Sequence, residues 1–338
     1  MGGNAFPNLK LVRLQAEDYI DFENEITSSL RTEFPDIRFY TIPSYREKES
    51  FGDCDLLYVT SNDKEVISKF GQCLGAVATI RNGPTTSYAI PWHRQLFQLD
   101  MIRESKETVD FARSYFSFND LGNLLGRIFH RAGFKFGHKG LQFIAREEGN
   151  ESHALREITL TTSFRSALEF IGYDYDRWVR GFETLEDIFK FAVSIPLASR
   201  TIFRLEETNH AARIRDRKRK TYQLFLLWVQ DPKNKVQEHE STSKEELRTW
   251  ALGKAFEVYP EFKDQFSYWQ QVAKELKEAK LRFNGKLVSE WTGLTGKDLG
   301  VFMANFKHQK MGISPTHWIL CRSGETIQEE VKEFMSKW

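Results

Sequence analysis

Residues 44–59 read SYREKESFGDCDLLYV, and this stretch decides how the first part of the chain is interpreted. The apolar run 54–60 follows a glycine and ends at the polar residues 61–63, which is the pattern of a strand. Asp53 and Asp55 lie two residues apart where that strand begins. Side chains two apart in a strand project to the same face, so the sequence predicts two carboxylates that point together.

A third carboxylate lies in the stretch LFQLDMI, residues 96–102, which is otherwise apolar. The large apolar residues of this strand alternate onto one face, which leaves Asp100 on the other. A lone acid in such a strand is costly unless it is paired or bound to a metal. Carboxylates that face one another repel, and oxygen ligands of this kind suit Mg²⁺. An isolated Asp-x-Asp pair more often faces water, so the third acid carries the prediction. We expect Asp53, Asp55 and Asp100 to hold two Mg²⁺ ions, for which Mn²⁺ can substitute.

Two metal ions in such a cage serve a particular chemistry. One lowers the pKa of a 3′-hydroxyl, and the other holds a triphosphate and stabilises the leaving pyrophosphate. Ser44, Arg46 and Lys48 offer a hydroxyl and two cations within five residues, which suits a triphosphate. The loop has no P-loop signature, and an ordinary charged surface turn explains it equally well when it is considered alone.

The hydrophobic pattern around these strands predicts a mixed α/β sheet with helices on one face, in a fold of the α+β class. The other elements expected here are helices at 14–33 and 63–71 and strands at 37–42, 76–81 and 87–91. From residue 119 the pattern is mostly helical, with strand-like pieces near 141–145 and 158–162 and helices at 183–193 and 221–230. The polar residues 231–244 are the best candidate for a domain boundary.

Composition limits the classes of partner. Lys and Arg total 48 against 47 Asp and Glu, a formal net charge of +1, so a nucleic-acid site must be a local basic patch. The three cysteines fit neither a disulfide framework nor a zinc cluster, which indicates a reducing, intracellular setting, cytoplasmic or nuclear. No apolar run approaches the roughly 20 residues that cross a bilayer, so we expect a soluble protein without a membrane partner.

The motifs together resemble a known family. SYR followed by GDCD is similar to the G-S-x-R and G-D-x-D signature of family-X DNA polymerases, in the DNA polymerase β superfamily of nucleotidyltransferases. Residues 115–123, YFSFNDLGN, resemble the Y-F-T-G-S-D-x-x-N nucleotide-binding segment of that family. The likeness covers about residues 10–195. It implies a nucleotidyltransferase palm at 1–118 and a thumb-like region that binds nucleotide and primer at 119–230. The helical pattern after the polar residues 231–244 predicts a mostly helical C-terminal domain at 245–338.

The resemblance also implies roles for single residues. Tyr115 and Phe116 would flank the sugar of the incoming nucleotide, Asp120 would lie against its base, and Asn123 would touch the base or the primer. Phe118 stands where the family has glycine, which leaves the choice of ribose or deoxyribose open.

The loop before the acids departs from the family as well. Pro43 replaces a glycine, Glu47 stands where an arginine often binds phosphate, and the loop to Asp53 is one residue shorter. The resemblance therefore does not assign the triphosphate contacts to individual residues of this loop.

Two further stretches suggest contacts with a polynucleotide. Residues 127–139, RIFHRAGFKFGHK, interleave cations with aromatic residues, and such a surface can neutralise phosphates and stack bases. The bland alternative is a helix end followed by a strand, with Phe134 and Phe136 in a core. Residues 283–300 resemble, more weakly, the helical tail of CCA-adding enzymes and bacterial poly(A) polymerases, although a glycine-rich turn with a helix cap explains them too. The cations expected to contact nucleic acid are Arg127, Arg131, Lys135, Lys139 and Lys297.

The charge run 213–220, RIRDRKRK, is either a linker or the start of the following helix. A solvated helix face and a nucleic-acid contact are equally good interpretations of it.

The function expected from these features is transfer of a nucleoside monophosphate from an NTP or dNTP to the 3′-hydroxyl of a nucleic acid. The acceptor is a DNA primer or a tRNA-like RNA, because the core and the tail resemble different relatives. Transfer to a protein or a small molecule is the alternative from another class, and the basic-aromatic stretch speaks against it. A degenerate nucleotide-binding module is a third interpretation, which the intact set of three acids disfavours.

Overall fold

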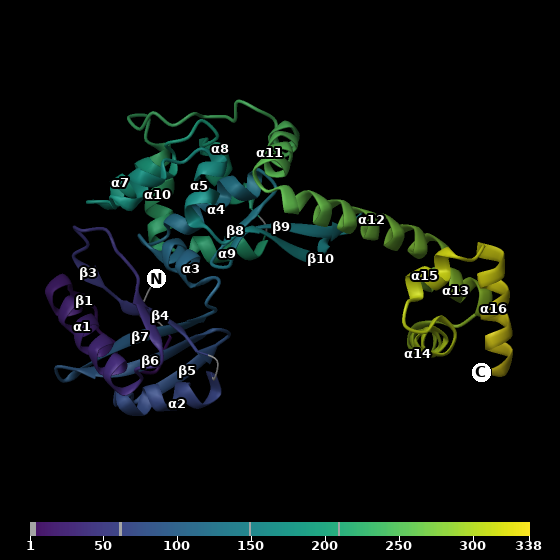
Figure 1. The fold of residues 1–338 in the computed structure, drawn as a ribbon, viewed down its shortest axis with the longest axis horizontal. Helices are drawn as coiled ribbons and strands as arrows, with labels where there is room; N and C mark the ends of the chain where they lie inside the picture. The colour runs from purple at the N-terminus through teal and green to yellow at the C-terminus, as the bar shows by residue number, and fades with distance from the viewer. Residues whose placement is uncertain (1–4, 61–62, 149, 209) are drawn as a thin grey trace. The chain divides into compact units, whose positions relative to one another are not determined.

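The computed structural model describes residues 5–60, 63–148, 150–208 and 210–338 (Figure 1). The chain divides into two compact units, of which the first comprises Met1–Phe143 and Thr159–Tyr259 and the second Ile144–Ile158 and Pro260–Trp338. The predicted boundary at 231–244 lies inside the first unit, and the second unit resumes later, at Pro260.

The first unit begins with a five-stranded mixed sheet, as predicted, in the order β2-β4-β7-β6-β5. Strands β4 and β7 pair in parallel, whereas the other neighbours are antiparallel. The strands are β2 (Arg38–Thr41), β4 (Asp53–Val59), β5 (Ala78–Asn82), β6 (Thr85–Trp92) and β7 (Gln95–Glu104). A separate two-stranded ladder joins β1 (Leu14–Gln15) to β3 (Ser50–Phe51).

The two faces of this sheet have different neighbours because the side chains of β4 and β7 alternate. Helices α1 (Ala16–Glu33) and α2 (Asp63–Cys73) contribute to the core on the face that includes Leu56 and Leu99. Leu57 and Ile102 point to the opposite face and pack against α3 (Val109–Phe116). The prediction of helices on one face therefore holds for α1 and α2, while α3 covers part of the other face. The acidic ends of β4 and β7 lie on this second face, beyond α3.

The rest of the first unit is mostly helical. A small sheet of order β10-β9-β8 begins in this unit, but Ile144–Ile158, which include parts of β9 and β10, belong to the second unit. The strands of this sheet are β8 (Lys135–Gly137), β9 (Gly140–Glu147) and β10 (Asn150–Thr161). The helices in the rest of the first unit are α4 (Leu121–Arg131), α5 (Phe164–Ile171), α6 (Tyr175–Val179), α7 (Leu185–Ala192), α8 (Arg200–Phe203), a 3₁₀ turn (Leu205–Glu207), α9 (His210–Arg217), α10 (Lys220–Gln230) and α11 (Lys244–Val258). Phe134 and Phe136 are buried in its aromatic core, in line with the bland alternative for those two residues.

The second unit confirms the helical C-terminal region. Its core is formed by helices α12 (Pro260–Arg282), α13 (Gly285–Thr292), α14 (Gly296–Phe306), α15 (Pro315–Leu320) and α16 (Gly324–Lys337), with a π-helical turn at Lys307–Met311. The segment Ile144–Ile158 is held to α12 by ion pairs of Lys277 with Glu148 and of Lys280 with Glu147. Within the part of the chain that the structure describes, no helix is long and apolar enough to span a membrane.

Candidate active site

The three predicted acids come together on the sheet. Asp55 on β4 lies directly opposite Asp100 on β7 in the parallel ladder, and Asp53 lies opposite Gln98. Each of the three acids offers an oxygen, and these oxygens all lie within 4.8 Å of one another. Parallel pairing in this register is what converts two distant sequence motifs into one cluster of carboxylates.

The electrostatics of the cluster are those of crowded, partly dehydrated acids. Burial, followed by the charges of Asp53 and Asp100, raises the pKa of Asp55 well above its ordinary value. Burial and the charge of Asp53 also raise the pKa of Asp100 to about 6, although hydrogen bonds from Ser87 and Gln98 oppose that shift. The Gln98 amide donates to both carboxylate oxygens of Asp100, at 3.0 and 2.9 Å.

A divalent cation fits this donor set. Three carboxylates at close range supply hard oxygen ligands, and a cation among them would relieve the repulsion that, after burial, raises the pKa values of Asp55 and Asp100. Mg²⁺ is commonly held by a small number of carboxylates together with substrate phosphates. Asp53, Asp55 and Asp100 are therefore the residues that could hold the metal.

A lysine lies beside the acids. The Lys48 ammonium donates a hydrogen bond to the Ser44 hydroxyl at 3.2 Å and lies 4.1 Å from the centre of the Phe51 ring. Burial lowers the pKa of Lys48, while the charges of Asp53 and Asp55 raise it. The Ser44 and Lys48 side chains thus form one hydrogen-bonded pair at the edge of the acidic cluster.

A cavity of about 610 Å³ opens at the acids. It brings together eight residues that the sequence singled out, namely Ser44, Lys48, Asp53, Asp55, Tyr115, Phe116, Asp120 and Asn123. These residues come from the loop before β4, from β4 itself, from α3 and from the start of α4. Asp100 does not line the cavity wall but adjoins it through its two acidic neighbours.

The turn between α3 and α4 is held in a strained conformation. Phe118 and Asn119 both have φ of 61°, a region that a bulky side chain rarely adopts. The Phe118 amide donates to the Pro43 carbonyl at 2.8 Å, and its ring packs edge-on against Phe182. These contacts fix the turn beside the loop that carries Ser44, at the position where the resembled family has glycine.

Arg46, unlike Ser44 and Lys48 of the same predicted triphosphate loop, does not line the cavity at the acids. Its guanidinium pairs with the Glu183 carboxylate and donates to the Arg180 carbonyl at 2.5 Å. It lines a neighbouring cavity and not the one that contains the acids. The loop itself is tied down there, because the backbone amide of Arg46 donates to the Phe182 carbonyl at 3.0 Å.

Sequence reasoning missed cations on the opposite wall of the cavity. The cavity is also lined by two cations at the start of α10, Arg219 and Lys220, and by the neighbouring Thr221. Arg219 forms an ion pair with Asp120, the residue expected to lie against the base. The signal was the charge run 213–220, which could not be assigned to a wall of this cavity without its partners.

A buried ionic network holds this wall in place. Asp216 on α9 is fully buried and pairs with Arg127 of α4 and with Arg215. The Arg215 guanidinium donates to the side-chain oxygen of Asn123 at 3.0 Å. This network therefore positions Asn123, and the backbone amide of Arg219 donates to the Asp216 carbonyl at 3.2 Å.

The structure separates the five cations expected to contact nucleic acid. Arg127 is only 11% exposed and is paired with Asp216, and Arg131 is paired with Glu240. Both cations serve interior contacts, because acids far along the chain fold back onto α4. Lys135 and Lys139, by contrast, are exposed. Lys297 is exposed in the first turn of α14, in the second unit.

No protein-family model matches this sequence, and no curated protein matches it either. The assignment of a function to this site therefore depends on the residues described above.

Proposed function

We propose that this protein is a metal-dependent nucleotidyltransferase with a polymerase-β-like palm, which transfers a nucleoside monophosphate from an NTP or dNTP to the 3′-hydroxyl of a nucleic acid. In this reaction the hydroxyl oxygen forms a bond to the α-phosphorus, its proton is lost, and the bond to the bridging oxygen of the departing pyrophosphate breaks. The observation that carries the proposal is the convergence of Asp53, Asp55 and Asp100 at the head of a nucleotide-sized cavity.

The metal is assigned to these acids. When bound, two Mg²⁺ ions would lower the pKa of the attacking hydroxyl and neutralise charge on the triphosphate and on the leaving pyrophosphate. The donor set also suits Mn²⁺. No side chain of the protein has to act as a nucleophile in such a transfer.

The remaining cavity residues have roles that follow from their chemistry. Lys48 and Ser44 provide a cation and a hydroxyl beside the acids, where the triphosphate would lie. Arg219 and Lys220 add positive charge on the facing wall. Tyr115 and Phe116 offer aromatic surface for the sugar and base, which agrees with the likeness of residues 115–123 to family-X DNA polymerases.

The direct test is primer extension with Mg²⁺. The protein is incubated with each NTP and each dNTP on a DNA primer, on templated DNA and on tRNA that lacks its terminus. We expect pyrophosphate release coupled to 3′-extension of one acceptor class, and this result also decides between DNA and RNA.

Asp100→Asn is the decisive variant, and Asp21→Asn, an exposed acid of α1, is its matched control. We expect extension to fall at least about 100-fold in Asp100→Asn, since loss of a ligand removes charge stabilisation at the reacting phosphate. The control is expected to retain parental extension. Unimpaired extension by Asp100→Asn would refute the assignment, and label transfer to a protein or a small molecule alone would replace the acceptor class.

A further inference from the structure

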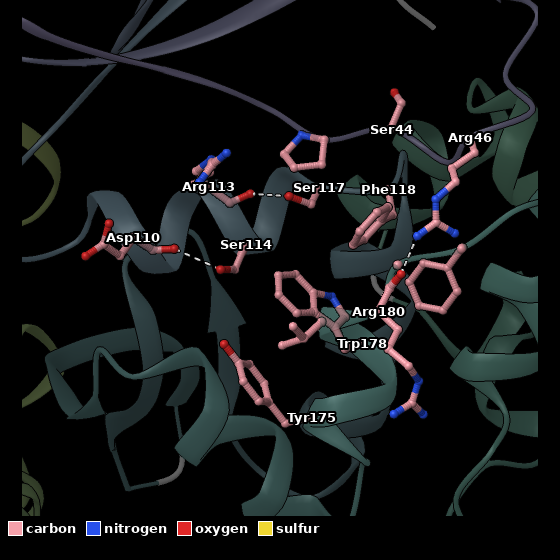
Figure 2. Close-up of a pocket in the computed structure, with 14 residues that line it drawn as sticks. Ser44, Arg46, Asp110, Arg113, Ser114, Ser117, Phe118, Tyr175, Trp178 and Arg180 are labelled. Atoms are coloured by element: carbon pink, nitrogen blue, oxygen red, sulfur yellow. Dashed lines mark hydrogen bonds between the residues drawn. The ribbon is translucent and has the colours of Figure 1, made fainter.

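We propose that the second cavity, on the far side of the Pro43-Ser44 turn from the acids, binds one nucleotide of the acceptor strand; this inference rests on the proposed function. The cavity has a volume of about 490 Å³, which is large enough for a nucleobase and its sugar. Figure 2 shows that its walls come from the Pro43-Ser44 turn, from one side of α3 and from residues 175–182. Of the residues to which the sequence analysis gave a role, only Ser44 and Arg46 line this cavity.

The first argument is aromatic surface. Tyr175 and Trp178 line the cavity, and their rings lie with centroids 5.7 Å apart and planes inclined by 19°. Trp178 also makes an edge contact with Phe118, which lines the same cavity. The Arg165 guanidinium lies 4.2 Å from the centre of the Tyr175 ring, so a base would use the part of this pre-ordered aromatic pair that Arg165 leaves uncovered. Stacking there carries no cost of ordering the rings, and any base can use it.

The second argument is charge. The lining residues include three arginines against a single acid, Asp110. Arg46 is already engaged by Glu183, but Arg113 uses only its Nε, which donates to the Thr41 carbonyl at 2.9 Å. Among the described residues no carboxylate forms an ion pair with Arg113 or with the exposed Arg180, although the charge of Arg113 acts on the Glu23 carboxyl and opposes the rise in pKa that burial causes there. The guanidinium groups of Arg113 and Arg180 can therefore donate hydrogen bonds to phosphate oxygens.

The third argument is the set of hydrogen-bond acceptors along α3. The Ser114 hydroxyl donates to the Asp110 carbonyl at 2.9 Å, and the Ser117 hydroxyl donates to the Arg113 carbonyl at 2.7 Å (Figure 2). With their protons so engaged, both oxygens face a ligand as acceptors. The amino groups of nucleobases are suitable donors for them.

Continuity with the acidic cavity favours a strand over a separate small molecule. Pro43 and Ser44 line both cavities, and different residues of α3 line each, so the two sites adjoin across this turn and this helix. A polymer with its 3′ end at the acids could place another of its nucleotides in the second cavity. Val179 and Arg180 are exposed at its rim, where the chain of the polymer can leave.

The test measures binding and needs no catalysis. Fluorescence anisotropy of 5′-labelled single-stranded DNA and RNA oligonucleotides is recorded with the parent protein and with Arg180→Gln and Tyr175→Ala. Tyr175→Phe keeps the ring, and Lys190→Gln removes one exposed cation of α7 that pairs with Glu186 outside the cavity. Thermal melting of each variant verifies that it is folded, and binding of the free mononucleotide is measured in parallel.

We expect Arg180→Gln and Tyr175→Ala each to weaken oligonucleotide binding about tenfold, as loss of a phosphate contact or of a stacked base does. The two control variants are expected to stay within about twofold of the parent, and mononucleotide affinity to be unchanged in all four. Oligonucleotides with a single 5-iodouracil should crosslink to the peptide that contains Tyr175 and Trp178 only from a position inside the strand.

Three other outcomes overturn the inference in distinguishable ways. Parental oligonucleotide affinity in both Arg180→Gln and Tyr175→Ala would remove the strand from this cavity and leave the proposed function intact. Loss of mononucleotide binding alone in these variants would make the cavity a site for a free nucleotide. A parent protein that binds no oligonucleotide at low salt would overturn both this inference and the nucleic-acid acceptor of the proposed function.

Discussion

Gly122 is the residue on which the close approach of α4 to α3 depends. A β-carbon at this position would lie 2.2 Å from the carbonyl oxygen of Tyr115. Both the new β-carbon and this oxygen are attached to helix backbone, so the clash can be relieved only by shifting α3 or α4. We expect Gly122→Ala to lower the free energy of unfolding by more than about 2 kcal/mol and to raise KM for the nucleotide, because Tyr115 is displaced. Denaturant unfolding and steady-state kinetics measure the two effects.

Gly126→Ala, on the same helix, is the matched control. Its β-carbon would meet the Phe136 carbonyl oxygen at 3.6 Å, which is an ordinary contact. We expect this variant to be as stable as the parent or up to ~1 kcal/mol more stable, from the higher helix propensity of alanine. Equal stability of the two variants would show that α3 and α4 are not held by this contact.

Asp100 links the proposed chemistry to the stability of the metal-free protein. Its pKa is raised from 3.8 to about 6, so the folded protein binds this proton more tightly than the unfolded chain does. The carboxyl's contribution to stability is thus present below about pH 4 and is lost as the pH rises through 6. Asp100→Asn carries no charge at any pH, and with a chelator at about pH 7.5 we expect it to be ~2 kcal/mol more stable than the parent.

Thermal melting across pH checks this expectation. The advantage of Asp100→Asn should disappear near pH 4, and added Mg²⁺ should stabilise the parent and Asp21→Asn but not Asp100→Asn. If Asp100→Asn is less stable than the parent in chelator at neutral pH, the acids do not repel one another as described.

At the scale of elements, the charge run 213–220 shows that long-range partners determine which residues of a segment are buried and which are exposed. Arg217 is exposed, whereas Asp216 is buried among arginines and Arg219 lies in the cavity wall. Local sequence predicts a polar helix or linker equally well, because the residues that bury Asp216 lie 89 and more positions away along the chain. The sequence pattern alone therefore could not predict that this segment forms part of the cavity wall.

The position of Arg219 leads to a kinetic prediction. We expect Arg219→Gln to raise KM for the nucleoside triphosphate about tenfold with a smaller change in kcat, since a cation on the facing wall assists binding. Arg217→Gln removes the same charge two residues earlier in the chain, at an exposed position that does not line the cavity, and is expected to match the parent. Equal KM values for the two variants would exclude Arg219 from the nucleotide site.

The sheet was predictable because its strands carry a strong alternation. The expected strands 54–60 and 96–102 correspond to β4 and β7, and the turn at Gly83-Pro84 separates β5 from β6. The three-residue strand β8 agrees with the alternative interpretation of residues 127–139, a helix end followed by a strand with Phe134 and Phe136 in the core. Arg46, by contrast, could not be placed, because its partners Arg180 and Glu183 lie in a loop far along the chain.

At the scale of the whole molecule, polarity proved a poor guide to where one unit ends. The polar stretch 231–244 lies in the first unit, where the Arg200 backbone bonds to Gln237, its side chain pairs with Glu238, and Arg131 pairs with Glu240. The second unit resumes between Tyr259 and Pro260, where two helices adjoin without a polar linker. Long-range ion pairs, which no local pattern reveals, hold the polar stretch in place.

Separate cores predict separate unfolding. The first unit has its core around the sheet and the second around residues such as Phe302 and Phe306. We expect two calorimetric transitions, of which Mg²⁺ together with a nonhydrolysable nucleotide raises only the one that belongs to the first unit. Phe302→Ala should lower the melting temperature of the other transition, because the cavity that it leaves reduces the free energy of unfolding of the second unit by roughly 3 kcal/mol. A single transition that moves as a whole would show that the two units unfold as one.

The parallel pairing of β4 with β7 also has a consequence for how the chain matures. Asp53 and Asp55 lie on β4, whereas Asp100 lies on β7 and is separated from them in the chain by α2, β5 and β6. Such non-local pairing is slow relative to local contacts. The three carboxylates therefore come together only when β4 pairs with β7, and uptake of the ion would mark the moment when this central pair of strands has closed.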